Sequence, residues 1–299
     1  MPPVTRRHFL CTTVSAAAGA AFGEETAPGP IIDIHQHTDY SGRTDEQLIA
    51  HQRQLGITRT VLLPAGRFFG LEASCGGNDR VMEVARRLPK EFTFFANEVP
   101  YLSDARDEIR RVLRAGGIGI GEQKFMVESD SRAIAIVAEL ARDFDVPVLL
   151  HFQFGRYNTS YERFERILEK FPRVRFIGHA QTFWANIDAR ADQATLYPKG
   201  PVTPGGLTDK FLADYPNFFG DLSAGSGLNA ITRDEQHARG FFERHQNKLM
   251  FGSDCNDAVG ACDACSGSQM LAAIRRLTSA EVRTKILSGN AQRCLKIAL

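Results

Sequence analysis

The sequence predicts an α/β fold consisting of one (β/α)8 barrel of the TIM type. Eight short runs rich in Val, Ile, Phe and Leu occur in the 299-residue chain, and a longer helix-compatible stretch follows each run. Spacings of about 25 to 45 residues between the runs fit the ~250 residues of a typical barrel. A doubly wound open sheet has the same alternation and is the alternative. We see no internal repeat and no division into two domains.

The spacing of apolar residues and the capping residues predict the individual strands and helices. Apolar residues at three- and four-residue intervals predict amphipathic helices between the strands, several of them opening with a capping residue. The strands are expected to begin near Ile31, Thr58, Phe92, Gly117, Val146, Arg173, Asn217 and Lys248. The clearest helices span 45–55, 130–144 and 161–171, with Thr44, Asp130 and Ser160 as caps. The connection 181–216, rich in Pro and Gly, would lie over the barrel mouth, as a lid or substrate wall or as a surface insertion without function.

The first 23 residues have the layout of an export leader. Arg6 and Arg7 precede an uncharged stretch of small and apolar residues, 11–22, which is short for a membrane anchor. The paired arginines, followed by Phe9 and Leu10, resemble the twin-arginine signal, which implies an exported, periplasmic protein. An amphipathic N-terminal arm is the alternative. Residues 24–30 are then a linker and 31–299 the barrel domain.

Composition narrows the classes of partner. The chain is 43% hydrophobic and 24% charged with a formal net charge of +1, so it has no basic footprint for nucleic acid. No uninterrupted apolar run approaches the ~18 to 20 residues that span a bilayer. We therefore expect a small-molecule substrate and no membrane span in the mature chain. A homo-oligomer is compatible with this composition.

Five of the eight predicted strands end in side chains that bind metals. Because side chains alternate along a strand, His35 and His37 after the first strand project to the same side. Closing the barrel would bring all five strand ends to one C-terminal mouth, where barrel enzymes keep their chemistry. The candidate ligands are His35, His37, Glu122, His151, His179 and Asp254.

Imidazole and carboxylate donors suit a divalent ion, zinc first, with manganese or iron as alternatives. A single histidine is more often structural, but four of the eight histidines fall on predicted strand ends. The remaining ones, His8, His51, His237 and His245, are expected in the leader or in surface and structural positions. Asp33 faces away from His35 and His37 in an ideal strand, which indicates a supporting or structural acid.

The ordered set His35-Gln36-His37, His151, His179 and Asp254 resembles the metal-dependent amidohydrolase superfamily. The ending Ile286 to Arg293 resembles the C-terminal segment of its amidohydrolase-related (amidohydrolase 2) branch. The resemblance implies a distorted barrel with one or two divalent ions. It implies hydrolysis of amide, ester or lactone bonds in most members, and decarboxylation of aromatic acids or hydration of double bonds in some.

The resemblance also implies roles for the residues. His35, His37 and His151 would bind metal, His179 would bind metal or polarise the substrate, and Asp254 would bind metal weakly and accept a proton from its water. Members differ at the fourth strand, which carries a carboxylated lysine, a glutamate or no bridging ligand. We favour Glu122 as ligand and Lys124 as a contact to a substrate anion. The alternative is an ion pair between Glu122 and Lys124 or an arginine.

The sequence leaves three functions open. The leading one is hydrolysis with Asp254 as the catalytic proton acceptor and His179 or the metal at the oxyanion. Non-oxidative decarboxylation is the second, and a metal-bearing or solute-binding protein without catalysis is the third. Arg67, Arg156 and Lys124 are candidates to pair a substrate carboxylate, although solvated surface charge is the more common fate of such residues. An aromatic wall for the decarboxylase would come from Phe68, Phe69, Phe125, Phe152 or Trp184.

The cysteines leave two alternatives. Cys262 and Cys265 form a local disulfide in an oxidising compartment, or they are reduced thiols in a loop. The cysteines between 255 and 265 lack an evident fourth ligand for a structural zinc site.

Overall fold

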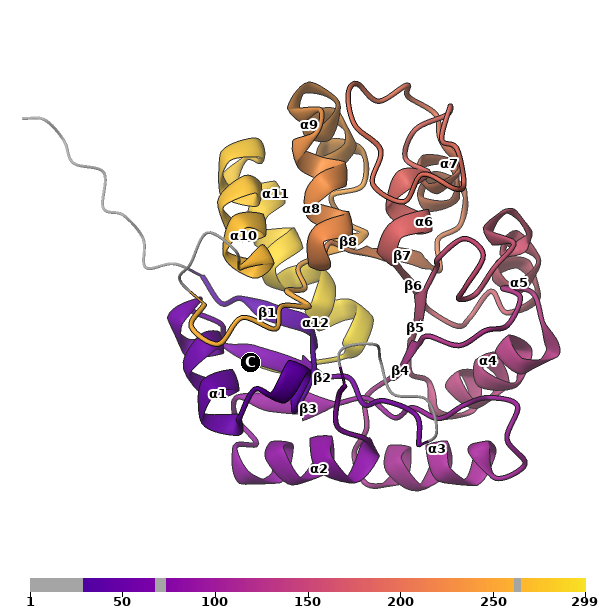
Figure 1. Ribbon diagram of the computed structural model, residues 1–299, viewed down its shortest axis with the longest axis vertical. Coiled ribbons are helices and arrows are strands. Elements are labelled where there is room, and N and C mark those ends of the chain that lie inside the picture. The colour runs from indigo at the N-terminus through magenta and orange to yellow at the C-terminus, as the bar shows by residue number, and fades with distance from the viewer. Residues whose placement is uncertain (1–28, 68–73, 261–264) are drawn as a thin grey trace, which may run out of the picture.

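The computed structural model describes residues 29–67, 74–260 and 265–299. The predicted leader 1–23 and most of the predicted linker 24–30 lie outside these ranges, as do Phe68, Phe69 and Cys262. The rest of the chain alternates strands and helices, and Figure 1 shows the helices arranged around the strands.

The described residues contain eight parallel strands, each within three residues of its predicted start. Seven of them are three to five residues long and almost fully buried, as expected for a sheet covered on both faces. The strands are β1 (Ile32–Gln36), β2 (Arg59–Leu62), β3 (Phe92–Phe94), β4 (Ile120–Gln123), β5 (Val148–His151), β6 (Phe176–His179), β7 (Phe218–Asp221) and β8 (Leu249–Met250).

Backbone hydrogen bonds join the two sheets, β1–β3 and β4–β8, at both seams. Between β3 and β4, the Ile118 amide donates to the Phe94 carbonyl at 2.9 Å. Between β8 and β1, the Ile34 amide donates to the Phe251 carbonyl at 3.1 Å. A doubly wound open sheet has no such bond between its first and last strands, so the predicted barrel is confirmed.

The helices follow the strands around the barrel. Their bounds are α1 (Asp45–Gln54), α2 (Asn78–Arg87), α3 (Ala105–Arg114), α4 (Arg132–Phe144), α5 (Glu165–Lys170), α6 (Ala180–Ala185), α7 (Leu207–Asp214), α8 (Ala224–Thr232), α9 (Glu235–Arg244), α10 (Ser266–Leu277), α11 (Ala280–Thr284) and α12 (Asn290–Leu295), with short turns η1 (Tyr40–Gly42), η2 (Tyr161–Arg163) and η3 (Lys285–Gly289). No helix in the described ranges is long and apolar enough to cross a membrane.

The predicted caps are partly confirmed. Thr44 forms a capping box with Gln47 at the start of α1. Helix α4 is capped by Ser131 rather than Asp130, because the Asp130 carboxylate is engaged by Arg163. The stretch 161–171 is not one helix: it divides into η2 and α5 after Ser160, whose φ is 59° and whose side chain makes no capping bond.

Two apolar cores flank the sheet. The larger lies between strands and helices. The smaller fills the barrel interior, where side chains such as Ile34, Val61 and Met250 pack with Leu295 and Ile297 at the C-terminal end of the chain. These apolar side chains form a plug that fills one end of the barrel interior. The polar side chains at the C-terminal strand ends lie at the opposite mouth.

The long connection is anchored to α8. Asn229 donates to the Pro198 carbonyl at 3.0 Å, and Arg233 donates to the Gly200 carbonyl and to Asp188. Gln181, two residues after β6, donates from its side-chain Nε2 to the Tyr197 hydroxyl oxygen at 3.3 Å. The connection therefore reaches the C-terminal end of β6, in the position expected of a substrate wall, and its role stays a prediction.

Candidate metal centre

The four predicted histidines converge at the C-terminal ends of β1, β5 and β6. Each is at most 4% exposed. The Nε2 atoms of His35 and His37 lie 3.1 Å apart. The His179 ring centroid is 4.6 Å from that of His35 and 5.3 Å from that of His151.

Each imidazole has one nitrogen bound to an outer partner. His37 Nδ1 donates to the Leu63 carbonyl at 2.8 Å, and this leaves Nε2 unprotonated in the neutral ring. The other outer contacts are His35 Nδ1 to Asp221 at 2.7 Å, His151 Nε2 to Gln153 Oε1 at 3.2 Å and His179 Nδ1 to Ser223 Oγ at 3.0 Å. Outer partners of this kind fix the tautomer of metal-binding histidines. In the neutral state that a bound cation requires, the four rings would each direct one lone pair to a shared space.

Asp221 is a supporting residue that our sequence analysis missed. Besides binding His35, its carboxylate accepts the Ser223 hydroxyl at 2.8 Å, and that hydroxyl oxygen is then the acceptor for His179. Asp221 is completely buried. It is the last residue of β7, so the strand-end rule that found the other candidates could have found it.

Glu122, at the end of β4, lies between two pairs of histidines. Its Oε2 is 3.7 Å from the Nε2 atoms of both His35 and His37. Its Oε1 is 2.5 Å from His151 Nδ1 and 3.7 Å from His179 Nε2. One carboxylate oxygen thus faces each pair, an arrangement that suits a carboxylate shared between two ions as well as a ligand to one.

Asp254 completes the centre from the segment after β8. Its Oδ1 is 3.5 Å from His37 Nε2, and its Oδ2 is 3.6 Å from His179 Nε2. The backbone holds it at a φ of 40°, with its amide donating to the His35 carbonyl at 2.9 Å. Oδ1 is buried without a hydrogen-bond partner among the described residues. A cation would satisfy such an oxygen, so the residues present fit a bound metal.

Opposite charges shift the pKa values inside the centre. Burial opposes the shift, but the carboxylates of Asp254 and Asp221 raise the pKa of His35 well above its ordinary value. Burial and the neighbouring charge of His35 lower the pKa of His179 to about 4. Against the cost of burial, His151 lowers the pKa of Glu122 well below its usual range. The centre therefore favours ionised carboxylates and a neutral His179.

Tyr40 is a second residue that the sequence did not indicate. Its ring packs edge-on against His37 with centroids 5.0 Å apart. The charge of Asp254, together with burial, raises the pKa of Tyr40 above its ordinary value. Tyr40 lies in η1, beyond β1, so no strand-end signal marked it.

The three predicted substrate contacts lie in two places. Arg67 binds the buried Glu98 at 2.6 Å and Asp104 at 2.7 Å. Lys124 and Arg156 both lie over the Tyr157 ring, at 5.5 and 5.2 Å from its centroid. That ring in turn contacts His151, with centroids 5.5 Å apart.

The predicted aromatic wall receives no support from its described members. Phe125, Phe152 and Trp184 are 3%, 0% and 1% exposed. Phe152 and Trp184 pack into the larger core, and the indole of Trp184 donates to the Asp221 carbonyl at 2.9 Å. Phe152 and Trp184 are therefore part of the packing around the barrel.

The chain belongs to the amidohydrolase family, whose family model matches residues 32–297. No curated protein sequence matches the chain significantly. Solved structures share the fold at low identity. An uncharacterized TIM-barrel protein from Bordetella bronchiseptica is 15% identical with a TM-score of 0.63, and the match covers 89% of this chain and 98% of that one. A putative 2-pyrone-4,6-dicarboxylic acid hydrolase from Pseudomonas putida is 16% identical with a TM-score of 0.63, covering 90% and 98%.

The similar folds include a second activity. A 5-carboxyvanillate decarboxylase from Sphingomonas paucimobilis is 17% identical with a TM-score of 0.55, and the match covers 84% of this chain and 82% of that one. Family membership indicates an enzyme that acts on small molecules with a divalent metal, and the His and Asp clusters could bind one.

Proposed function

We propose that this protein is a metal-dependent hydrolase that cleaves an ester, lactone or amide bond in a small molecule bearing a carboxylate. The unpartnered Oδ1 of Asp254, beside imidazoles that are oriented by outer hydrogen bonds, carries the proposal. It supplies a base next to the place where a cation would sit.

In the proposed mechanism His35, His37, His151 and Glu122 would hold the metal, and zinc is the ion that we propose. When bound, a divalent ion would lower the pKa of a coordinated water toward neutrality and so supply the hydroxide nucleophile. Asp254 takes the proton from the attacking water and passes it to the leaving group. Tyr40 packs edge-on against His37, and the charge of Asp254 acts on its hydroxyl. His179 holds the ion or polarises the scissile carbonyl.

The charges near His151 support an anionic substrate. Lys124 and Arg156 gather on Tyr157, which contacts a predicted ligand. Guanidinium and ammonium groups bind carboxylates strongly when water is excluded. The Pseudomonas putida neighbour is named as a hydrolase of a dicarboxylic acid, which is the same substrate class. Arg67 stays a weaker candidate, because two carboxylates already bind it.

The test combines metal content with turnover. We expect near-stoichiometric zinc, manganese or iron in purified protein by inductively coupled plasma mass spectrometry. We also expect hydrolysis of carboxylated lactones or esters in preference to their neutral methyl esters. A protein that takes up no metal when supplied, or that binds metal and turns over no lactone, ester or amide, contradicts the proposal.

Decarboxylation is the competing activity, because a neighbour of the same fold is a decarboxylase. Release of carbon dioxide from aromatic acids, without hydrolysis of esters or lactones, would replace the hydrolase proposal. We further propose export through the twin-arginine leader. An intact mass lacking about 23 residues in a periplasmic fraction supports export, and a full-length mass there contradicts it.

A further inference from the structure

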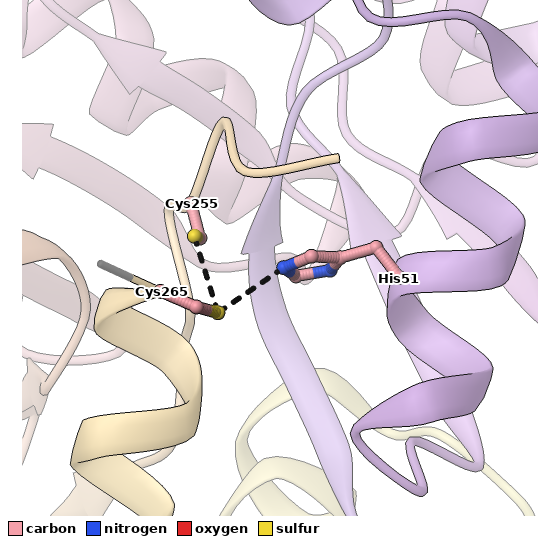
Figure 2. A group of neighbouring side chains, drawn as sticks. All are labelled: His51, Cys255 and Cys265. Carbon is pink, nitrogen blue, oxygen red and sulfur yellow. Dashed lines mark hydrogen bonds between the residues drawn. The ribbon is translucent and has the colours of Figure 1, made fainter. Parts of the chain in front are cut away.

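A second group of donor side chains lies apart from the histidine centre, and Figure 2 shows it. His51 comes from α1, Cys255 from the segment after β8, and Cys265 from the residue before α10. Their exposed fractions are 0%, 3% and 0%. The two sulfur atoms lie 3.4 Å apart, and His51 Nε2 lies 3.4 Å from Cys265 Sγ. Both cysteines are free thiols, and Cys262, the predicted disulfide partner of Cys265, lies outside the described residues.

Hydrogen bonds fix the orientation of the His51 ring. The Gln52 amide nitrogen donates to Asp33 and to Thr60, both at 2.8 Å, so both of its protons are used. The Gln52 oxygen therefore accepts from His51 Nδ1 at 3.0 Å. His51 Nε2 is left with its lone pair directed toward the thiols, which is the state a metal-binding histidine requires.

The spacing of the three donors fits a tetrahedral ion. Zinc bonds of about 2.3 Å to sulfur and about 2.0–2.1 Å to nitrogen give ligand-to-ligand edges of roughly 3.8 Å and 3.5 Å. The observed separations of 3.4 Å come within a few tenths of an ångström of both. The Ser268 amide also donates to Cys265 Sγ at 3.4 Å, at the N-terminus of the twelve-residue helix α10. This amide donor favours the thiolate form that binds metals, although without an ion the adjacent Cys255 and burial raise the pKa of the Cys265 thiol.

We propose that His51, Cys255 and Cys265 form a second metal site, for a thiophilic d¹⁰ ion, Zn²⁺ or Cu⁺. Two thiolates and one imidazole select such ions over Mg²⁺, Ca²⁺ and Mn²⁺, which prefer oxygen ligands. The site shares no ligand with the histidine centre and does not depend on the proposed hydrolase function.

An ion here would tie α1 to the connection between β8 and α10. That connection already packs closely on α1, because a Cβ at Gly260 would come within 2.8 Å of the His51 carbonyl oxygen. Gln36 and Arg43 both donate to the Cys255 carbonyl, at 2.9 and 2.8 Å. Since Cys255 follows Asp254 directly, the ion would fix the segment that carries the proposed base.

Cobalt is the probe for the test. The full chain, reduced and freed of metal, is titrated anaerobically with Co²⁺, which shows sulfur-to-cobalt charge-transfer absorption in the near ultraviolet when thiolates bind it. We expect this band in the wild-type protein and its loss in Cys255→Ser and Cys265→Ser. Cys294→Ser is the matched control, because Cys294 is a buried thiol in the barrel plug. His35→Ala with His37→Ala should keep the band while the protein loses the other ion.

Displacement of Co²⁺ by Zn²⁺ or by Cu⁺ then distinguishes the two ions. The wild-type spectrum requires no variant, so a cysteine variant that fails to fold leaves the test intact. A reduced wild-type protein that binds Co²⁺ without a sulfur band overturns the proposal. So does mass spectrometry showing Cys255 and Cys265 joined in a disulfide that persists in protein isolated without added oxidant and supplied with zinc.

Discussion

The histidine centre and the thiol cluster are both buried, yet they differ in donor type and in what remains unsatisfied. The centre combines imidazoles with Glu122 and Asp254, and one Asp254 oxygen lacks a partner in the described structure. The cluster combines thiols with one imidazole, and its donors contact one another. The centre is equipped to hold a hard or borderline ion and move protons, whereas the cluster can hold a soft ion and fix a loop.

Asp33 connects the two regions. Its carboxylate accepts from the Ser253 amide at 2.9 Å on the side of the centre and from Gln52 on the side of the cluster. Burial raises the pKa of Asp33 despite these donors. The sequence predicted a supporting or structural acid facing away from His35 and His37, and these contacts agree with that interpretation.

The largest effect should come from removing the first pair of ligands. In His35→Ala with His37→Ala, we expect the ion of the centre to be lost and turnover to fall to the background of buffer containing metal. The thiol cluster should keep its sulfur-to-cobalt band. Metal content and the cobalt spectrum, measured on one preparation, check both. Loss of the band together with the ion would show that the two regions are not independent.

Asp254→Asn separates binding from proton transfer within the centre. We expect turnover to fall by about 10²–10⁴, the usual contribution of a general base, with metal still bound. Asp143→Asn, an exposed change on α4, is the matched control and should keep full turnover. Full activity in the metal-loaded Asp254→Asn enzyme would exclude Asp254 as the base.

Asp221→Asn tests the outer support of the centre. His35 would lose its anionic acceptor, and Ser223 would lose the acceptor that orients it toward His179. Loss of such a partner typically costs 10–100-fold in metal affinity or activity. Competition with a chelator measures the affinity, and an unchanged value would reduce Asp221 to a packing residue.

Gln52→Leu makes the corresponding change at the thiol cluster. Without its amide oxygen, the His51 tautomer is no longer fixed, and the affinity for Co²⁺ at the cluster should fall by about 10–100-fold. Zinc content at the histidine centre is the internal control. An equal loss at both sites would indicate general damage through Asp33.

The smallest effect concerns acid stability of the metal-free protein. The pKa of His179 is about 4 when folded, against an ordinary value of 6.5, so between these values the unfolded state binds the extra proton. This contribution therefore favours folding above pH 6.5 and is lost as the pH falls toward 4. In His179→Asn, the urea midpoint should depend less steeply on pH across this window. An unchanged slope would contradict a buried neutral His179.

Much of the fold could be predicted from local pattern. Short runs rich in Val, Ile, Phe and Leu located all eight strands, because fully buried parallel strands are nearly continuous in apolar residues. Predicted helix boundaries were wrong where a specific side-chain contact competes with helix propensity. Asp130 did not cap α4 because it pairs with Arg163, and 161–171 divides at Phe164 into η2 and α5.

The candidate site was predictable where its residues end strands. His35, His37, Glu122, His151, His179 and Asp254 meet because a closed barrel brings strand ends to one mouth. Asp221 could have been predicted in the same way, because it is the last residue of β7.

The sequence by itself determined the eight strands, their order and the donor types that follow them. Only the tertiary structure decided the outer hydrogen bonds, the position of Tyr40 over His37, and the pairing of His51 with Cys255 and Cys265. The physical reason is the distance along the chain between the residues that interact. Strand pattern is set by neighbours in the chain, whereas His51 and Cys265 are 214 residues apart and meet only when β8 closes the barrel against β1.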